Sequence, residues 1–122
     1  MIKDIKRKEK RKIRHSRIRE KIKGNTEKPR VSYYGSLKHI YIQAIDDTKG
    51  ETLLSLSTLS KDIKNLIEGK SQKEIHSILG QKFAELLLDK GIKKIVFDRG
   101  GYLYHGNLKL LCEEMRKMGI EF

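Results

Sequence analysis

Half of the basic side chains of this chain stand in its first quarter. Residues 1–30 contain 14 of the 28 lysines and arginines but only four acids, a net charge of +10, whereas residues 31–122 carry a net charge of only +2. A block of like charges repels itself and usually serves as an interaction arm. The hydrophobic core must therefore come from the rest of the chain, whose length suits one small domain. We predict a basic arm and linker over residues 1–28 and a globular domain over residues 29–122.

The arm contains good helix formers and neither glycine nor proline before Gly24, which predicts a helix over residues 4–22. Its isoleucines do not gather on one side of that helix, and it has no Trp, Phe or Leu to enter a lipid headgroup layer. We therefore expect no membrane contact and a helix that is ordered by phosphate groups, with a solvated disordered tail as the alternative. Gly24 suits a left-handed helix end, and Pro29 ends whatever precedes it.

The globular part changes its hydrophobic period halfway along. β-Branched and aromatic runs give way to apolar stripes at helical spacing. The expected elements, in chain order, are strands over 30–34, 39–45 and 52–58, a helix over 71–90, a strand over 92–97 and a helical stripe over 108–118. A strand that follows a crossover helix should lie parallel to an earlier strand. The order predicts an α/β fold with a mixed four-stranded sheet, made of a three-strand antiparallel meander and then helix, strand and helix, with the helices packed on the sheet.

The loop DRGGYLYHG, residues 98–106, joins the carboxyl end of the last strand to the last helix, where ligands bind in open α/β sheets. Its glycines let the backbone approach a ligand, Arg99 offers a fork for a phosphate or a base edge, and Tyr102, Tyr104 and His105 offer stacking surfaces. The glycine spacing fits neither a dinucleotide-binding fingerprint nor a P-loop, so RNA is favoured over a nucleotide cofactor. In the alternative, the glycines only form a tight turn and the tyrosines pack inward.

Four aspartates raise the hypothesis of a metal-dependent nuclease, since paired carboxylates can hold two metal ions: Asp46, Asp47, Asp62 and Asp98. Turn formation is the simpler interpretation of the DDTKG segment, and Asp62 is expected to start a short helical turn after Ser60. We therefore expect no enzyme activity, no metal and no cofactor.

The spacing of the histidines and the single cysteine predicts neither a metal site nor a catalytic nucleophile. The four histidines have no metal-ligand spacing, and His76 is expected on the surface of its helix. The single cysteine, Cys112, excludes an internal disulfide and has no base arranged beside it, which makes it a small core residue.

Several strings of the sequence match one family in combination. They are the arm RKIRHSRIREKIKG, the segment KPRVSYYGSLKHIYIQAIDDTKGETL, LSTLSKDIK, and KGIKKIVFDRGGYLYHG with its closing helix and GIEF end. The chain closely resembles the bacterial-type large-subunit ribosomal proteins numbered eighteen, the 5S rRNA-binding family of the central protuberance. The resemblance covers the whole chain apart from a weakly matching stretch over residues 65–77.

The resemblance implies the translational-machinery α/β fold, related to ribonuclease-H-like architecture but without catalytic activity. It also implies contacts to 5S rRNA, to large-subunit rRNA and to neighbouring proteins of the central protuberance, in the ribosome of a bacterial cytoplasm or of an organelle such as a plastid. A non-specific polyanion binder remains an alternative.

The resemblance also implies a set of rRNA-binding residues in the arm, the first hairpin and the glycine loop. They are Lys6, Arg7, Lys8, Lys10, Arg11, Lys12, Arg14, His15, Arg17, Arg19, Lys21, Lys23, Arg30, Ser36, Lys38, His39, Tyr41, Arg99, Gly100, Gly101, Tyr102, Tyr104, His105 and Gly106. Two positions depart from the family pattern: Gly35 and Asn107 stand where the family usually has basic residues, and Lys109 is placed to compensate for Asn107.

Overall fold

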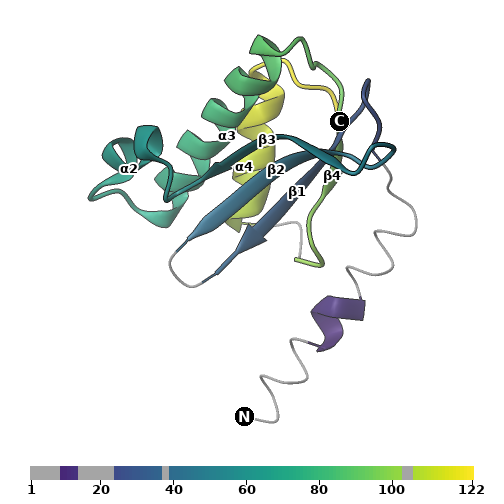
Figure 1. The fold of residues 1–122 in the computed structure, drawn as a ribbon. Helices are drawn as coiled ribbons and strands as arrows, with labels where there is room; N and C mark the ends of the chain where they lie inside the picture. Colours follow the sequence, from purple (N-terminus) through teal and green to yellow (C-terminus); the bar gives the residue numbers. More distant parts are fainter. Residues whose placement is uncertain (1–8, 14–23, 37–38, 103–105) are drawn as a thin grey trace.

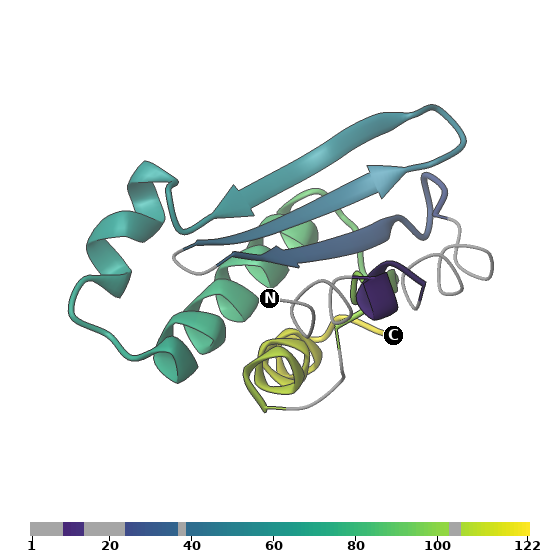
Figure 2. The same ribbon diagram turned by 90° about the horizontal axis from the view of Figure 1, so that it is seen from below.

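The structure is a computed structural model that describes residues 9–13, 24–36, 39–102 and 106–122. Two long helices cover one face of a four-stranded sheet, and no helix among the described residues covers the other face, which is called the open face below (Figures 1 and 2). The elements are β1 (Arg30–Gly35), β2 (Ile40–Asp46), β3 (Glu51–Ser57), α2 (Lys61–Ile67), α3 (Gln72–Asp89), β4 (Val96–Asp98) and α4 (Gly106–Lys117). Residues 9–13 of the arm are also helical.

The sheet order is β3-β2-β1-β4. The first three strands are antiparallel neighbours, and β4 pairs in parallel with β1. The α/β class, the meander and the parallel last strand are confirmed, while the ribonuclease-H-like description fits this small sheet only loosely. α2 also forms where a helical turn was expected, after Ser60 and with Asp62 in its first turn.

β4 is shorter than the predicted strand over 92–97. Before Val96 the chain pairs with the C-terminal segment instead: the N–H of Ile95 donates to the carbonyl of Glu121 at 3.1 Å. Ile92 and Ile95 are nevertheless buried. The apolar pattern therefore identified core residues correctly, but it could not tell sheet pairing from pairing with the chain end.

The core lies between the sheet and the two long helices. Val31 and Ile42 of the sheet belong to one buried cluster with Phe83 of α3 and Leu111 of α4, and all four are fully buried. Gly80 lets the two helices approach closely, because a Cβ at this position would lie 2.6 Å from the carbonyl oxygen of Leu111. Ser71 caps the N-terminus of α3, because its hydroxyl accepts a hydrogen bond from the Glu74 N–H at 3.3 Å.

Gly24 does not have the left-handed conformation that the sequence suggested. Its φ is not positive, and it is buried at the point where the described chain resumes after the arm. A Cβ here would lie 2.1 Å from the backbone nitrogen of Arg30 and 2.8 Å from the carbonyl oxygen of Ile45. Close backbone packing, and not a helix end, requires this glycine.

The prediction that His76 lies on the surface was wrong. His76 is 5% exposed, because it faces the sheet from the first turns of α3. Its Nδ1 donates to the carbonyl of Gln72 at 2.7 Å, and its Nε2 lies 3.0 Å from the Tyr33 hydroxyl. Burial lowers the pKa of His76 below the ordinary 6.5, although the Gln72 carbonyl opposes the shift.

This burial makes stability depend on pH. In the unfolded chain His76 takes up a proton near pH 6.5, whereas in the folded chain it does so only at a lower pH. The contribution of His76 to the free energy of unfolding is therefore fully present above pH 6.5 and is lost as the pH falls below it. The loss is at most about 1.4 kcal/mol per pH unit. We expect urea unfolding at about pH 5.5 to show a lower free energy than at about pH 7.5, and the difference to shrink in His76→Gln. An equal difference in both proteins would contradict this assignment.

Candidate nucleic-acid interface

Tyr102 binds the backbone at the C-terminal end of β1. β4 pairs with β1 only at Arg30–Ser32, so the backbone beyond that point needs another partner. The Tyr102 hydroxyl donates to the carbonyl of Gly35 at 2.8 Å and accepts from the Gly35 N–H at 3.3 Å. Its ring stands edge-on to Tyr33, with ring centroids 5.4 Å apart. The glycine loop is thereby fastened to the end of the first strand.

The arm meets this loop at the same tyrosine. Arg11 donates from Nη1 to the Tyr102 hydroxyl at 2.9 Å, and its guanidinium carbon lies 4.9 Å from the centre of the ring. A guanidinium over an aromatic face is a favourable cation–π arrangement. A cavity of about 250 Å³ opens between the arm and the sheet, lined by Arg11, Lys12, Ser32, Tyr33, Tyr34 and Gly100. Basic side chains of the arm and aromatic side chains of β1 thus line the same cavity.

The glycines of the loop form a tight turn against β1. Gly100 and Gly101 have φ values of +65° and +81°, and the Tyr102 N–H donates back to the carbonyl of Arg99 at 3.1 Å. A Cβ at Gly100 would lie 2.8 Å from the carbonyl oxygen of Tyr33. Both glycines are buried, so the backbone that they bring close is that of the protein's own strand. For these residues and the half-buried Tyr102, the tight-turn alternative describes the geometry.

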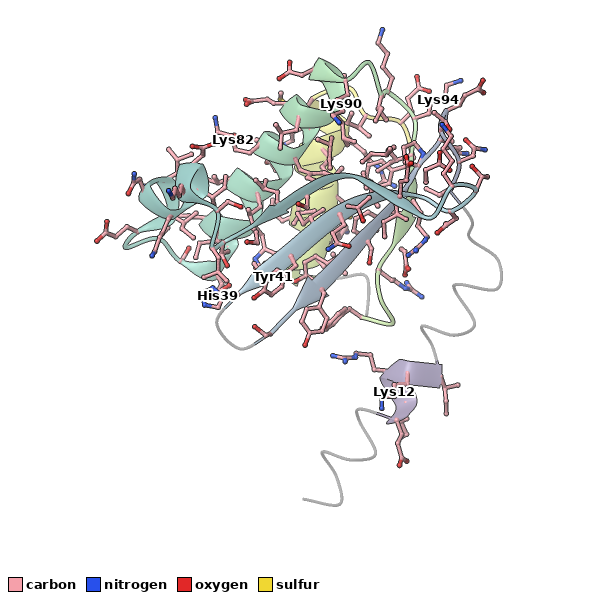
Figure 3. The ribbon with its side chains drawn as sticks, in the orientation of Figure 1. Lys12, His39, Tyr41, Lys82, Lys90 and Lys94 are labelled. Carbon is pink, nitrogen blue, oxygen red and sulfur yellow. The ribbon has the colours of Figure 1, made fainter. Side chains whose placement is uncertain are left out.

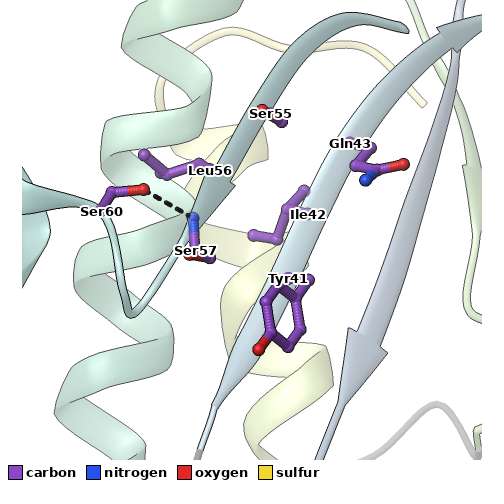
Figure 4. A pocket seen from close by; sticks show the side chains of 7 residues that line it. All are labelled: Tyr41, Ile42, Gln43, Ser55, Leu56, Ser57 and Ser60. Carbon is purple, nitrogen blue, oxygen red and sulfur yellow. Dashed lines mark hydrogen bonds between the residues drawn. The ribbon is translucent and has the colours of Figure 1, made fainter.

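The open face of the sheet carries aromatic and uncharged polar side chains. Tyr34 is 50% exposed and lies in register with Tyr41, and the centroids of the two rings are 6.0 Å apart. Beside them is a shallow hollow of about 150 Å³, shown in Figure 4. Its lining comprises Tyr41, Ile42, Gln43, Ser55, Leu56, Ser57 and Ser60.

Tyr34 was not among the residues predicted from the sequence. The signal that could have found it is the alternation of β1, which turns Tyr34 away from the buried Tyr33. Tyr41 shows the same alternation on β2 between the buried Ile40 and Ile42.

Ser36 and His39 close the hairpin between β1 and β2. The Ser36 N–H donates to the carbonyl of His39 at 2.8 Å, and the Nδ1 of His39 lies 2.9 Å from the Thr58 hydroxyl. In the view of Figure 3, His39, Tyr41 and Lys12 lie toward the lower end of the molecule, whereas Lys90 and Lys94 lie toward the opposite end.

Comparison with known proteins identifies the family. Residues 5–122 match the model described as ribosomal L18 of archaea, bacteria, mitochondria and chloroplasts. The chain belongs to this family. The large ribosomal subunit protein uL18 of Dictyoglomus thermophilum is 53% identical over 116 residues, 95% of each chain. The protein of that name from Caldicellulosiruptor saccharolyticus is 48% identical over 122 residues, all of this chain and 98% of the relative.

The resemblance inferred from the sequence is therefore confirmed, and the chain is a ribosomal protein of the bacterial L18 type. Within the part of this L18-family chain that the structure describes, no helix is both long and apolar enough to cross a membrane.

In this L18-family chain, Arg30 has partners inside the protein. Only 6% of it is exposed, and its Nε and Nη2 bind Oδ2 and Oδ1 of Asp47 at 2.9 and 3.1 Å. Its Nη1 binds Oδ2 of the fully buried Asp98 at 2.9 Å. The hydrogen bond to Asp47 raises the pKa of Arg30 above its ordinary value, against the lowering effect of burial. Arg30 was predicted to contact rRNA, but these contacts place its guanidinium in a buried ion-pair network.

The other two aspartates of the nuclease hypothesis, Asp46 and Asp62, have structural roles. Asp46 accepts hydrogen bonds from the hydroxyl of Thr26 at 2.6 Å and from the backbone and hydroxyl of Thr48, and these bonds lower its pKa below the ordinary range. Asp62 is exposed in the first turn of α2. Among the described residues, no three His, Cys, Asp or Glu side chains are grouped so that they could hold a metal ion. Asp46, Asp47 and Asp98 thus accept hydrogen bonds from groups within the fold.

Apart from Arg30, the predicted site residues lie near the arm–loop contact, at the hairpin end, at the start of α4, or outside the described part of the chain. Near the arm–loop contact lie Lys10, Arg11, Lys12, Arg99, Gly100, Gly101 and Tyr102, and at or near the hairpin end lie Ser36, His39 and Tyr41. Gly106 is exposed at the start of α4, where its φ is +59°. The other predicted residues lie outside the described part of the chain: Lys6, Arg7, Lys8, Arg14, His15, Arg17, Arg19, Lys21, Lys23, Lys38, Tyr104 and His105.

Proposed function

We propose that this chain binds 5S rRNA and attaches it to large-subunit rRNA in the central protuberance of the ribosome, as a structural and non-enzymatic component. Neighbouring large-subunit proteins of the protuberance are its further partners. The observation that carries the proposal is the contact of Arg11 with Tyr102, which joins the basic arm to the glycine loop in one surface. Membership of the ribosomal L18 family supports the same conclusion.

In this proposal the arm supplies the affinity. Its residues neutralise phosphates along the RNA backbone, which releases condensed counterions and makes binding steeply dependent on salt. Lys10 and Lys12 are exposed on the helical segment next to Arg11, so they are available to an RNA strand that reaches the 250 Å³ cavity.

The folded domain supplies the selectivity. Folded RNA offers unstacked bases in loops and bulges, which proteins recognise by stacking on aromatic rings and by hydrogen bonds to base edges. Tyr34 and Tyr41 present rings on the open sheet face, and Gln43 adds a donor and an acceptor beside them. A double helix of RNA offers no such bases, so this face favours a folded RNA with internal loops.

Capture from total cellular RNA tests the proposal. The tagged chain is incubated with protein-free RNA from a bacterium, washed at about 0.15 M salt, and the retained RNA is sequenced. We expect 5S rRNA to be enriched over its share of the input, relative to transfer RNA and to unrelated short RNA. Retention of all RNAs in proportion to the input would identify a non-specific polyanion binder and overturn the proposal.

A further inference from the structure

The Arg30 network touches both of the elements to which the proposed function assigns RNA binding. On one side, Asp47 holds Gly24, in the linker between the basic arm and β1: the Gly24 N–H donates to Asp47 Oδ2 at 2.7 Å, and the Asp47 N–H donates to the carbonyl of Gly24 at 3.2 Å. On the other side, Oδ1 of Asp98 accepts the N–H of Gly100 at 2.9 Å, at the start of the glycine loop. Arg30 lies between the two carboxylates and binds both.

We propose that Arg30 is a positioning residue that fixes the arm and the glycine loop relative to each other, so that both meet one RNA at once. This inference rests on the proposed function and adds the device that joins its two parts. A guanidinium suits this role because its donors lie in one rigid plane and can engage two carboxylates in fixed directions.

The surroundings of the network leave it little freedom. Arg30 is 6% exposed and Asp98 is fully buried, so water competes weakly for their hydrogen bonds. Gly24 is packed so tightly against Arg30 and Ile45 that no side chain fits there, and a Cβ at Gly100 would lie 2.8 Å from the carbonyl oxygen of Tyr33. The backbone at Gly24 and at Gly100 is therefore held firmly in place against the strands.

The contact between Arg11 and Tyr102 connects the arm to the glycine loop a second time. The chain enters the domain at Gly24 beside the start of β1, whereas Arg11 lies at Tyr102, which is bound to Gly35 at the other end of the same strand. The arm is thus held at both ends of β1. RNA that binds the arm at the Arg11 end then meets the loop in a position that the network has already set, and this lowers the cost of ordering both elements on binding.

The effect of Asp47→Asn on RNA affinity distinguishes a positioning role of the network from a simple effect of charge, because the two predict changes of opposite direction. Asp47→Asn removes a negative charge near a polyanion, so charge alone predicts equal or tighter RNA binding. Loss of positioning predicts weaker binding. An asparagine oxygen in the place of Oδ2 can still accept from the Gly24 N–H and from Arg30 Nε, but its NH2 group then faces the Nη2 donor of Arg30, so that hydrogen bond and the ion pair are lost. Asp89→Asn is the matched control, since Asp89 is exposed at the end of α3 and the charge change is the same.

The experiment measures the affinity of the full chain for 5S rRNA at a fixed salt concentration, with thermal unfolding to establish that each variant is folded. We expect Asp47→Asn to weaken binding by about fivefold or more, as is typical when two coupled sites are uncoupled, and Asp89→Asn to bind as the unchanged chain or slightly tighter. A folded Asp47→Asn that binds like Asp89→Asn would overturn the proposal. Failure of the unchanged chain to prefer 5S rRNA would instead overturn the proposed function.

Arg30→Lys is the second variant and distinguishes positioning from a direct contact with phosphate. Lysine keeps the positive charge but cannot bridge Asp47 and Asp98 with a planar fork. If Arg30 positions the two elements, Arg30→Lys weakens binding by about as much as Asp47→Asn. If Arg30 instead bound a phosphate directly, the lysine would retain most of the affinity, and this result would contradict the proposal.

Discussion

Replacing Lys10, Arg11 and Lys12 together by glutamine is expected to weaken binding to 5S rRNA roughly 100-fold at about 0.15 M salt. Each of these side chains belongs to the described part of the basic arm, and two of them line the cavity beside the sheet. Every phosphate contact that is lost returns about one condensed counterion to the RNA. Removal of three contacts should therefore make the plot of log affinity against log salt shallower by about two to three in slope. Binding isotherms over a salt series measure both quantities.

The matched control removes the same charge from the other end of the molecule. Lys82, Lys90 and Lys94 lie away from Lys12 and Tyr41 in Figure 3, and their replacement by glutamine also lowers the net charge by three. We expect this triple variant to lose at most a few-fold in affinity, because charges beyond the Debye length of about 8 Å are largely screened. Equal losses in the two triple variants would mean that affinity follows net charge alone, which would contradict a localised binding surface.

Phe83→Ala is expected to destabilise the folded chain by about 3–5 kcal/mol, the largest stability effect that we predict for a single substitution. Phe83 of α3 is the largest fully buried side chain among the described residues and belongs to the core cluster between the sheet and the two long helices. Its removal loses the transfer free energy of the ring and leaves a cavity that helices as closely packed as α3 and α4 cannot fill. Urea unfolding at neutral pH measures the difference.

Leu66→Ala is the control for this prediction. Leu66 belongs to α2 and is 42% exposed, so its truncation should change the free energy of unfolding by no more than about 0.5 kcal/mol. If Phe83→Ala cost less than about 1 kcal/mol, the layer that joins the sheet to the helices would not be the main core of the domain.

The periodicity of the sequence was enough to predict the architecture. Alternation along β2 separates the buried Ile42 from the open face, and the helical stripe through Phe83 predicts the face of α3 that packs on the sheet. These features follow from local spacing, which a single sequence displays directly. The start of β4 could not be predicted in the same way, because it depends on which distant segment takes the hydrogen bonds of Ile95.

The polar interior was harder to predict, since its partners are distant in the sequence. Arg30 forms a hydrogen bond with Asp98, 68 residues away, and His76 forms one with Tyr33, 43 residues away. A basic residue next to a basic arm is most simply interpreted as part of that arm, and a histidine on a helix as a surface residue. The sequence contains no local signal that distinguishes these interpretations from burial with a partner. Similarly, the glycines of the loop indicated close backbone approach, but the partner at Gly100 is the protein's own strand.

The most direct test of the account is the salt dependence of binding to 5S rRNA, measured beside an unrelated RNA hairpin of similar length. If the arm engages about eight phosphates, log affinity should fall against log salt with a slope of about −6 to −7, and 5S rRNA should bind more tightly than the hairpin at every salt concentration. A flat response, or equal affinities for the two RNAs, would contradict the claim that a basic arm fastened to a folded α/β domain holds this particular RNA.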